Sequence, residues 1–388
     1  MVMSLESVER ELARLRMNDD GTLGLRASVL NLIVMVGEES AEEVARGVSE
    51  LANRHPSRSI ILVSDADGES SLDIRLSAFC SLRGGSGDNV CSEQITVYAG
   101  GPPALHLESV AGPLLVPDLP TFLFYPEGFP DSDDGVIRLA DRVILDSSAS
   151  PGCERSFRKI SALVESPDTP AVGDIQWTAL SPWRSLAGEL FSSPERSGDL
   201  RNIREVEVMH TAGGESRAML FAGWLASSLG WMPKKNRPSD SENEVSEGGV
   251  SEKGLSEKGL SERGVFESGI YESEVSGRGV SGRGVSGRGF VFDGLSGEMV
   301  FRTFPSADDV DLSRITLRAG DLSFVISRHK ELTEAHISVE RGDETLSHRA
   351  VRIGRFDMGT MLDEELKFKG RDPVYESSLE KVMEMMNI

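Results

Sequence analysis

The sequence has few cysteines, and their number is odd. Cys80, Cys91 and Cys153 include no Cys-x-x-Cys pair, which is typical of a reducing compartment rather than of a disulfide framework. No apolar run approaches the 18 or so residues of a membrane span, and the first residues lack a basic segment followed by an apolar one. These absences predict a cytoplasmic protein.

Basic charge is also scarce. The 388 residues contain 41 lysines and arginines against 63 aspartates and glutamates, so the formal net charge is −22. An acidic surface repels phosphate backbones and anionic lipids, so we expect neither nucleic acid nor a membrane as a partner. The length suffices for two domains, each with its own core.

Motifs that carry chemistry are missing as well. The stretch Gly277-Arg-Gly279-Val-Ser-Gly282 matches the dinucleotide pattern G-x-G-x-x-G, but it arises from a repeat and follows no buried strand. The sequence contains no P-loop and no Gly-x-Ser-x-Gly elbow, and its six histidines lack metal-ligand spacing. We therefore expect no catalytic residues, no metal and no cofactor, and predict a protein that is not an enzyme. Cys91 is either an accessible, redox-active thiol or an ordinary buried cysteine.

Residues 28–165 read as alternating strands and helices, and the N-terminal domain is expected to span 1–165. Apolar, β-rich runs predict strands, and Ser40 with Glu43 predicts a capping box that starts a helix. The predicted strands are 29–36, 59–64, 72–81, 94–98, 121–125 and 142–146; the predicted helices begin at 41, 104 and 136. Uninterrupted apolar strands with amphipathic helices between them favour a sheet covered on both faces. The fold class is therefore α/β, with an N-terminal Rossmann-like three-layer domain.

The Pro-containing segment 165–172 marks the expected domain boundary. Residues 173–232 and 291–388 combine helices with period-two strand patterns, so they predict an α+β domain. One predicted helix starts at Ser181-Pro182, one spans 215–229 and ends at Gly230, and the last starts at Pro373 with Asp372 as its cap. The strand patterns predict turns at 319–321 and 341–343. Between them, 233–290 is predicted to be an insertion, in which nine pentapeptides of the type Ser-Glu/Gly-x-Gly-apolar run from 246 to 290. So little apolar surface favours a flexible insertion over a solenoid.

Several motifs occur along the chain in a characteristic order. They are His55-Pro-Ser-Arg58, Val90-Cys-Ser-Glu-Gln-Ile95, Pro117-Asp-Leu-Pro120, Ala140-Asp-Arg-Val-Ile-Leu-Asp-Ser147, Gly173-Asp-Ile-Gln-Trp-Thr-Ala-Leu-Ser-Pro-Trp-Arg184, Gly223-Trp-Leu-Ala-Ser-Ser-Leu-Gly-Trp231, Leu362-Asp-Glu-Glu-Leu366 and Gly370-Arg-Asp-Pro-Val-Tyr-Glu376. Together, this series resembles the OpcA family of glucose-6-phosphate dehydrogenase assembly proteins. The chain departs from the family at Ala179, where arginine is common, and at Phe124-Tyr125, which replaces a tryptophan-rich strand end. The resemblance implies a non-catalytic protein that binds glucose-6-phosphate dehydrogenase and promotes its active form, in support of the oxidative pentose phosphate pathway.

Two groups of residues are candidates for binding. Trp177, Trp183 and Arg184 are of the types enriched at binding hot spots. The alternative is that both tryptophans anchor the core; Trp183, on the apolar stripe of its helix, favours this alternative, whereas Trp177 leaves the two open.

His55, Arg58, Arg142 and Asp146 flank predicted strands, where they could line an anion or sugar-phosphate site or simply be solvated ends of strands. The alternative function is therefore an enzyme or sensor that binds a sugar phosphate or a nucleotide.

Overall fold

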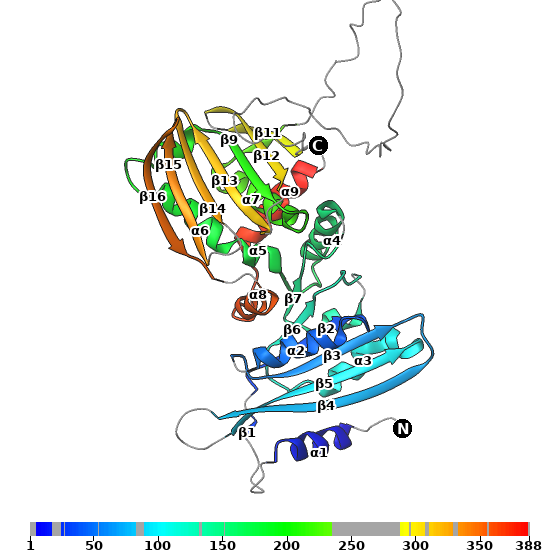
Figure 1. The fold of residues 1–388 in the computed structure, drawn as a ribbon. Helices are drawn as coiled ribbons and strands as arrows, with labels where there is room; N and C mark the ends of the chain where they lie inside the picture. Colours follow the sequence, from blue (N-terminus) through cyan, green and yellow to red (C-terminus); the bar gives the residue numbers. More distant parts are fainter. Residues whose placement is uncertain are drawn as a thin grey trace, which may run out of the picture.

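The computed structural model contains two eight-stranded sheets with helices packed on and between them (Figure 1). The structure describes residues 5–17, 25–26, 28–52, 54–82, 89–131, 134–150, 152–234, 288–294, 296–306, 310–328, 333–354 and 357–386. Most of the pentapeptide repeat lies outside these ranges; its last three residues, 288–290, begin strand β11.

The first sheet has the strand order of a Rossmann fold. Six parallel strands lie in the order β5-β3-β2-β6-β7-β8, which is 3-2-1-4-5-6 when they are numbered along the chain. Strand β4 adds an antiparallel edge next to β5, and the short β1 pairs with the start of β5. The bounds are β1 Leu25–Arg26, β2 Leu30–Val36, β3 Ser57–Asp65, β4 Ser71–Leu82, β5 Asn89–Gly100, β6 Thr121–Tyr125, β7 Arg142–Leu145 and β8 Ala171–Asp174. The predicted three-layer α/β fold is confirmed.

Helices cover both faces of this sheet, which explains why its strands are apolar on both sides. Along β2, Ile33 belongs to one buried cluster, whereas Leu32 and Val34 belong to the other. The first face packs against α1 Leu5–Leu15, α3 Leu107–Ala111 with the flanking 3-10 turns η1 Pro102–His106 and η2 Gly112–Leu114, the 3-10 turn η3 Gly135–Leu139, and α4 Cys153–Glu165. The second face packs against α2 Ala41–Leu51, α5 Ile175–Ala179 and α8 Met358–Glu365. Because α8 comes from the end of the chain, both halves of the sequence build this face.

One local prediction in the helices was wrong. Ser40 stands before α2, but its side chain accepts no N–H group of the helix; its hydroxyl instead donates a hydrogen bond to the Glu127 carboxylate. Helix α6, Ser181–Leu190, starts at the predicted residue, although Leu180 rather than Ser181 occupies the cap position. Strand β8, Ala171–Asp174, begins within the segment 165–172, where the sequence predicted a domain boundary.

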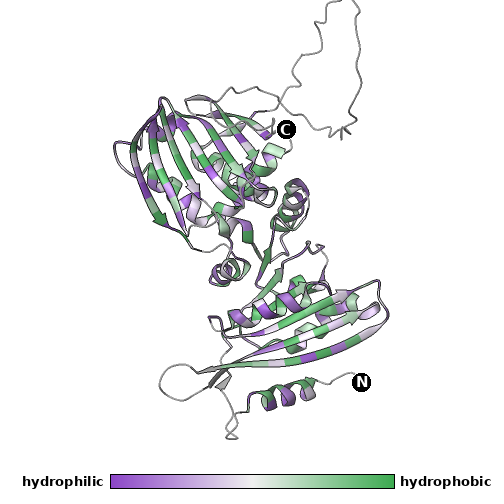
Figure 2. Ribbon diagram, in the orientation of Figure 1, coloured by the Kyte–Doolittle hydropathy of each residue, from purple (hydrophilic) through white to green (hydrophobic). Residues whose placement is uncertain are grey.

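The second sheet is antiparallel apart from one parallel pair, β12 with β9, and has the order β10-β11-β12-β9-β13-β14-β15-β16. Its strands are β9 Ile203–His210, β10 Met232–Pro233, β11 Arg288–Gly294, β12 Gly297–Pro305, β13 Leu312–Ala319, β14 Leu322–Arg328, β15 Glu334–Arg341 and β16 Glu344–Arg352. Hydropathy alternates along these strands, as the stripes in Figure 2 show, so that one face is apolar. The predicted turns at Gly320 and Gly342 are confirmed, and both glycines have positive φ angles, 62° and 58°.

Helices α6 and α7 Glu215–Leu229 cover the apolar face of the second sheet, and α9 Pro373–Met386 packs against α7. Helix α7 has the predicted bounds and ends at Gly230 in the left-handed conformation, as expected for a glycine that follows a helix. The turns η4 Asp199–Asn202 and η5 Ala212–Gly214 frame β9. None of the described helices combines the length and the apolar character that crossing a bilayer requires.

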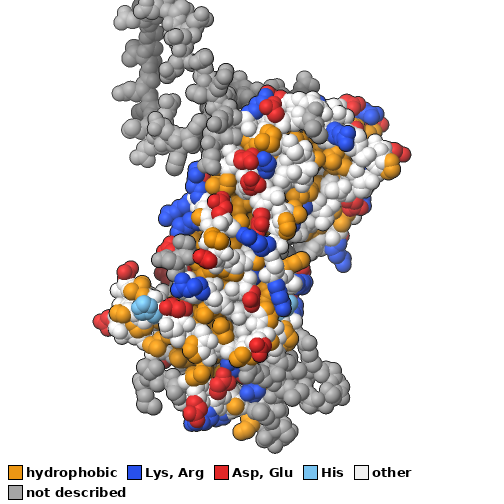
Figure 3. All heavy atoms as spheres, turned by 180° about the vertical axis from the view of Figure 1, so that it is seen from behind, with side chains coloured by type: hydrophobic (Ala, Val, Ile, Leu, Met, Phe, Trp, Pro, Cys, Tyr) orange, Lys and Arg blue, Asp and Glu red, His pale blue; other side chains and the backbone are white. Residues whose placement is uncertain are grey.

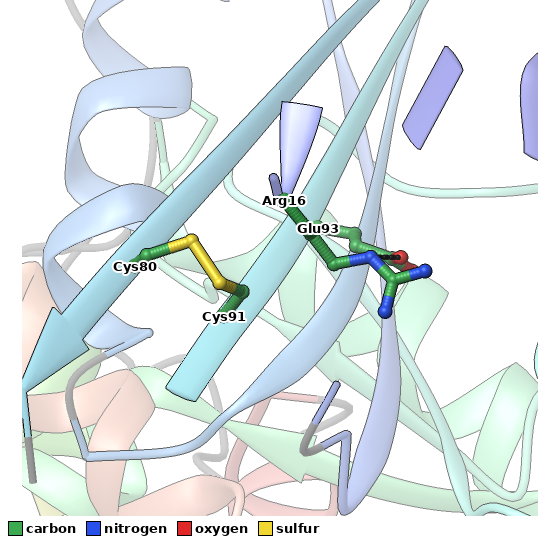
Figure 4. Close-up of a disulfide and its surroundings, with 4 residues drawn as sticks. All are labelled: Arg16, Cys80, Cys91 and Glu93. Atoms are coloured by element: carbon green, nitrogen blue, oxygen red, sulfur yellow. Dashed lines mark ion pairs between the residues drawn. A yellow bond between two sulfur atoms is a disulfide. The ribbon is translucent and has the colours of Figure 1, made fainter. Parts of the chain in front are cut away.

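The expectation that all three cysteines are unpaired was wrong. Cys80 on β4 and Cys91 on β5 are directly opposed in the strand register, with Cα atoms 4.0 Å apart, and form a disulfide (Figure 4). Cys91 is buried and Cys80 is exposed. Arg16, which follows α1, lies close by, and its guanidinium is 3.1 Å from the Glu93 carboxylate. Cys153 is buried, and burial raises the pKa of its thiol to about 12, so this thiol is unreactive at neutral pH.

Candidate functional site

The first place to look for a ligand is the point where the strand order reverses, between β2 and β6. Rossmann folds bind dinucleotides there, at the carboxyl ends of the strands, with the pyrophosphate on the amino terminus of the first helix. In this chain β2 runs into Gly37-Glu38-Glu39-Ser40, and α2 then starts with Glu42 and Glu43. Strand β6 is followed by Glu127, whose carboxylate accepts the Ser40 hydroxyl. Carboxylates therefore stand where a dinucleotide-binding protein has glycines.

Five carboxylates around one helix terminus reverse the electrostatics of that position. The partial positive charge of a helix amino terminus, about half an elementary charge, favours a phosphate only while no fixed anions neutralise it. Glu38, Glu39, Glu42, Glu43 and Glu127 are all exposed at this edge of the sheet. A pyrophosphate would meet these negative charges, so the residues present do not fit a dinucleotide.

A second site lies at the carboxyl ends of β7 and β8, where the first sheet meets helix α7. The Asp146 carboxylate accepts hydrogen bonds from the Ser148 backbone and hydroxyl, at 2.8 and 2.6 Å, and from the Gln176 amide at 2.8 Å. The Asp174 carboxylate accepts the backbone N–H groups of Ser147 and Gln176 at 3.2 and 2.9 Å. Asp174 caps α5 in this way, as an aspartate at a helix start commonly does.

Burial makes Asp174 an unusual acid. Its side chain has no solvent exposure, and this burial, reinforced by the nearby Asp146 carboxylate, raises the pKa of Asp174 to about 7. The Tyr375 hydroxyl lies 3.3 Å from its second oxygen. On the other side, Arg217 of α7 donates to the Gln176 side chain at 2.6 Å, so the polar cluster ties the two sheets together.

Trp177, on α5, is the centre of a third group of contacts. Its indole N–H donates to Asp372 at 2.8 Å, and the Arg184 guanidinium stacks on the indole with 3.5 Å between its carbon and the ring centroid. Asp372 also accepts the backbone N–H groups of Val374 and Tyr375, as predicted for the cap of α9. Burial lowers the pKa of Arg184 to about 10, so it stays cationic at neutral pH.

Of the three predicted partner-binding residues, only Arg184 is partly accessible. Trp177 is 4% exposed and Trp183 is 2% exposed, so a partner protein reaches neither indole directly. Trp183 packs in the hydrophobic core, and Trp177 supports Arg184 from below. The residue types identified Trp177 and Arg184 as candidates from the sequence. The contact between Trp177 and Asp372, which are 195 residues apart, could not be predicted from it.

Two exposed apolar side chains lie near Asp372 in the sequence. Phe368, in the turn between α8 and α9, is 64% exposed, and Val374, in the first turn of α9, is 47% exposed. We call Arg184, Phe368, Asp372 and Val374 the junction surface. The turn is fixed on the first sheet, because Arg142 donates to the Gly370 carbonyl at 2.6 Å.

The structure does not bring the four predicted anion-binding residues together. His55, Arg58 and Arg142 lie at the amino ends of strands, whereas Asp146 lies at the carboxyl end of β7. Each of these three side chains also has an acidic neighbour: the partners are Asp363 for His55 at 3.0 Å, Glu93 and Glu9 for Arg58 at 2.6 and 2.5 Å, and Glu365 for Arg142 at 2.7 Å. These carboxylates occupy the side-chain nitrogens that would have to bind an anion. Cys91 is likewise engaged, in the disulfide.

Metal chemistry is not indicated either. Within the described ranges, no group of three or more histidine, cysteine, aspartate or glutamate side chains is arranged to hold a metal ion. The ionisable groups of the site instead pair with one another and with backbone groups.

Comparison with protein-family models identifies both halves of the chain. Residues 48–162 match the model described as glucose-6-phosphate dehydrogenase subunit N-terminal domain, and residues 170–261 match the corresponding C-terminal domain. Together the two matches extend over more than half of the chain, in the order in which the domains occur in the family.

Curated relatives agree with these matches. Proteins named putative OxPP cycle protein OpcA are 28% identical over 188 residues in Synechocystis sp. and 30% identical over 209 residues in Nostoc punctiforme. The alignments cover 47% and 52% of this chain but only 39% and 44% of the relatives, so the chain spans less than half of their length.

Solved structures give a more distant similarity. The 3-ketoreductase KijD10 from Actinomadura kijaniata, in its open conformation, aligns with a TM-score of 0.48 at 9% identity, covering 93% of this chain and 96% of the other. An oxidoreductase described as putative, from Magnetospirillum magnetotacticum, aligns with a TM-score of 0.43 at 8% identity, covering 92% and 99%. This similarity is too distant to bear on function.

Proposed function

The chain belongs to the OpcA family of glucose-6-phosphate dehydrogenase assembly proteins, and from this we propose that it binds glucose-6-phosphate dehydrogenase and promotes its active form without catalysing a reaction. The observation that carries the proposal is the match of both halves of the chain to the domains of this family. In that role the protein supports the oxidative pentose phosphate pathway, the process named in its curated relatives.

The switch point of the first sheet supports a non-catalytic role. The fold is one that commonly holds a dinucleotide, but Glu38, Glu39 and Glu127 repel the phosphates such a cofactor carries. The alternative, an enzyme or sensor that binds a nucleotide on the first domain, is therefore disfavoured at its expected position. An activator needs no nucleophile or acid–base pair; it needs a higher affinity for the active form of its target.

We place the contact with the dehydrogenase at the junction surface. Phe368 and Val374 expose apolar side chains, and Arg184 presents a guanidinium held flat by the Trp177 ring. Aromatic residues and arginine dominate the energetics of protein interfaces, especially where the arginine is already ordered before binding. Because this surface lies where α8 and α9 join the two sheets, binding there would respond to how the two halves are arranged.

The surface charge favours a protein partner over nucleic acid or a membrane. On the face shown in Figure 3, acidic and basic side chains are interspersed among apolar ones. The net charge of −22 opposes binding to phosphate backbones and to anionic lipid headgroups. A partner with a mixed polar and apolar interface suits this surface better.

The test is the activity of purified glucose-6-phosphate dehydrogenase with and without the full chain, together with co-elution of the two proteins. We expect co-elution and a higher velocity or a lower KM. Phe368→Ser and Arg184→Ala should weaken both effects, whereas Phe79→Ser, which removes a 39% exposed phenylalanine from the distant strand β4, should not. Absence of co-elution together with unchanged kinetics would refute the proposed function.

A further inference from the structure

A pocket lies in the second half of the chain, away from the junction surface. It opens where the turn η4, the end of α7 and the turn between β11 and β12 meet, and it has a volume of about 340 Å³. Pockets that hold small molecules commonly start at about 300 Å³. The residues that the argument uses are Ser197, Arg201, Arg204, Ser228, Trp231 and Ser296.

The lining of this pocket is positively charged. Two arginines contribute to it, and none of the described lining residues is acidic, although the chain as a whole carries a net charge of −22. The nearest hairpin acids, Asp293 and Glu298, form ion pairs with Lys234 at 2.9 and 2.8 Å. Glu205, next to Arg204 in the sequence, pairs with Arg302 and Arg318, so among the described residues no ion pair joins either pocket arginine to a carboxylate.

The two arginines differ in how they are held. The Arg204 guanidinium donates to the backbone carbonyls of Ile203 and Ser296, at 3.2 and 2.6 Å, which fixes it without neutralising it. Arg201 is exposed, and its guanidinium makes no hydrogen bond or ion pair with any residue that the structure describes. Arg204 is thus oriented before a ligand binds, whereas the Arg201 side chain can move to contact one.

The rest of the lining combines hydroxyl groups with an aromatic ring. Ser197, Ser228 and Ser296 belong to three separate segments that meet at the pocket. Trp231 packs against Phe292, with 6.2 Å between ring centroids, and Gly294 lies against its indole so closely that a Cβ would come within 3.2 Å. Hydroxyl groups and an aromatic ring edge are suited to a polyol, which has both hydroxyl groups and apolar C–H groups.

We propose that this pocket binds a sugar phosphate, with the phosphate on Arg201 and Arg204, the sugar hydroxyls on the serines, and the mostly buried Trp231 as the apolar floor of the pocket. Guanidinium groups match the planar, paired geometry of phosphate oxygens, and hydrogen bonds between charged groups are about twice as strong as neutral ones. The volume suits a monosaccharide rather than a dinucleotide. The site is independent of the proposed contact with the dehydrogenase and can be tested without that partner.

The experiment is calorimetric titration of the full chain with a hexose 6-phosphate, the uncharged hexose and inorganic phosphate. We expect the hexose phosphate to bind at least tenfold more tightly than either of the others. Arg201→Ala should weaken binding about tenfold, the effect of losing one charge-assisted hydrogen bond, and Arg204→Lys should weaken it as well. The matched control is Arg138→Ala, which removes an exposed arginine outside the pocket.

Two results would overturn the proposal. The first is no heat of binding at millimolar hexose phosphate, and the second is equal affinity of the parent chain and the folded Arg201→Ala variant. Equal affinity for inorganic phosphate would overturn the assignment to a sugar phosphate. Circular dichroism of each variant separates a lost site from a lost fold.

Discussion

Replacing Asp174 by asparagine should stabilise the protein at alkaline pH and remove a pH dependence of its stability. Asp174 is fully buried, and its pKa is raised from 3.8 to about 7, first by burial and then by Asp146. Between these two values the folded protein retains a proton that the unfolded chain has lost. The contribution of Asp174 to stability is therefore most favourable below about pH 4 and is lost as the pH rises towards 7.

The size of the effect follows from the size of the pKa shift. One pKa unit corresponds to about 1.4 kcal/mol, so a shift of about three units costs the folded state up to about 4 kcal/mol above pH 7. An asparagine oxygen can still accept the N–H groups of Ser147 and Gln176, while its amide carries no charge to desolvate. Asp174→Asn should therefore be more stable than the parent chain at pH 8 by roughly 2–4 kcal/mol, and the two should be similar near pH 4.

Urea unfolding between pH 4 and pH 8, followed by circular dichroism, measures this difference. The control is Asp357→Asn, the same change at an exposed helix cap, which should keep the pH dependence of the parent chain. If Asp174→Asn keeps that dependence too, or is the less stable chain at pH 8, then Asp174 is ionised in the folded state and the reasoning fails.

Three further predictions concern other contacts. Arg184→Ala should lower the free energy of unfolding by about 0.5–2 kcal/mol, the worth of a cation–π contact, and a loss below that range in urea unfolding would contradict the stacked geometry. Reduction of the disulfide between Cys80 and Cys91 should destabilise the chain by about 2–3 kcal/mol, as measured by unfolding with and without reductant; an unchanged midpoint would mean that the pair is not bonded in solution. Arg142→Ala leaves a buried carboxylate without its partner and should cost about 3–5 kcal/mol, whereas Arg10→Ala, which breaks an exposed helical ion pair, should cost under about 0.5 kcal/mol; equal losses would contradict the difference in burial.

The elements that the sequence predicts well are those whose apolar pattern is set by burial alone. Strand β6, Thr121–Tyr125, is apolar throughout because helices cover both of its faces, and α7 is apolar on most sides because it lies between the second sheet and α9. The turn glycines Gly320 and Gly342 were found because positive φ angles favour that residue. In each case the residue pattern within the element is sufficient to predict its structure.

Elements with weak or mixed patterns were missed. Helix α1 and helix α4 are amphipathic but rich in charge, and β8 is only four residues long, Ala171–Asp174, so it resembles a linker. Cys80 and Cys91 are 11 residues apart, a spacing that reveals a bond only once the register of the β4–β5 hairpin is known.

The candidate site depends on contacts between distant parts of the chain. Arg58, Arg142 and His55 looked available for an anion because their acidic neighbours come from other segments; Glu365, for example, is 223 residues from Arg142. Conversely, the pocket at Arg201 and Arg204 joins three segments, none of which carries a recognisable motif. Side-chain pairing of this kind is fixed by the tertiary fold, which local patterns do not encode.

The most direct test of the proposed function is the rate of purified glucose-6-phosphate dehydrogenase as the full chain is titrated into it. The account predicts a saturable rise in kcat/KM that ends at a fixed ratio of the two proteins, and a weaker rise with Arg184→Ala. A rate that stays constant up to a large excess of the chain, with no complex on gel filtration, would contradict it.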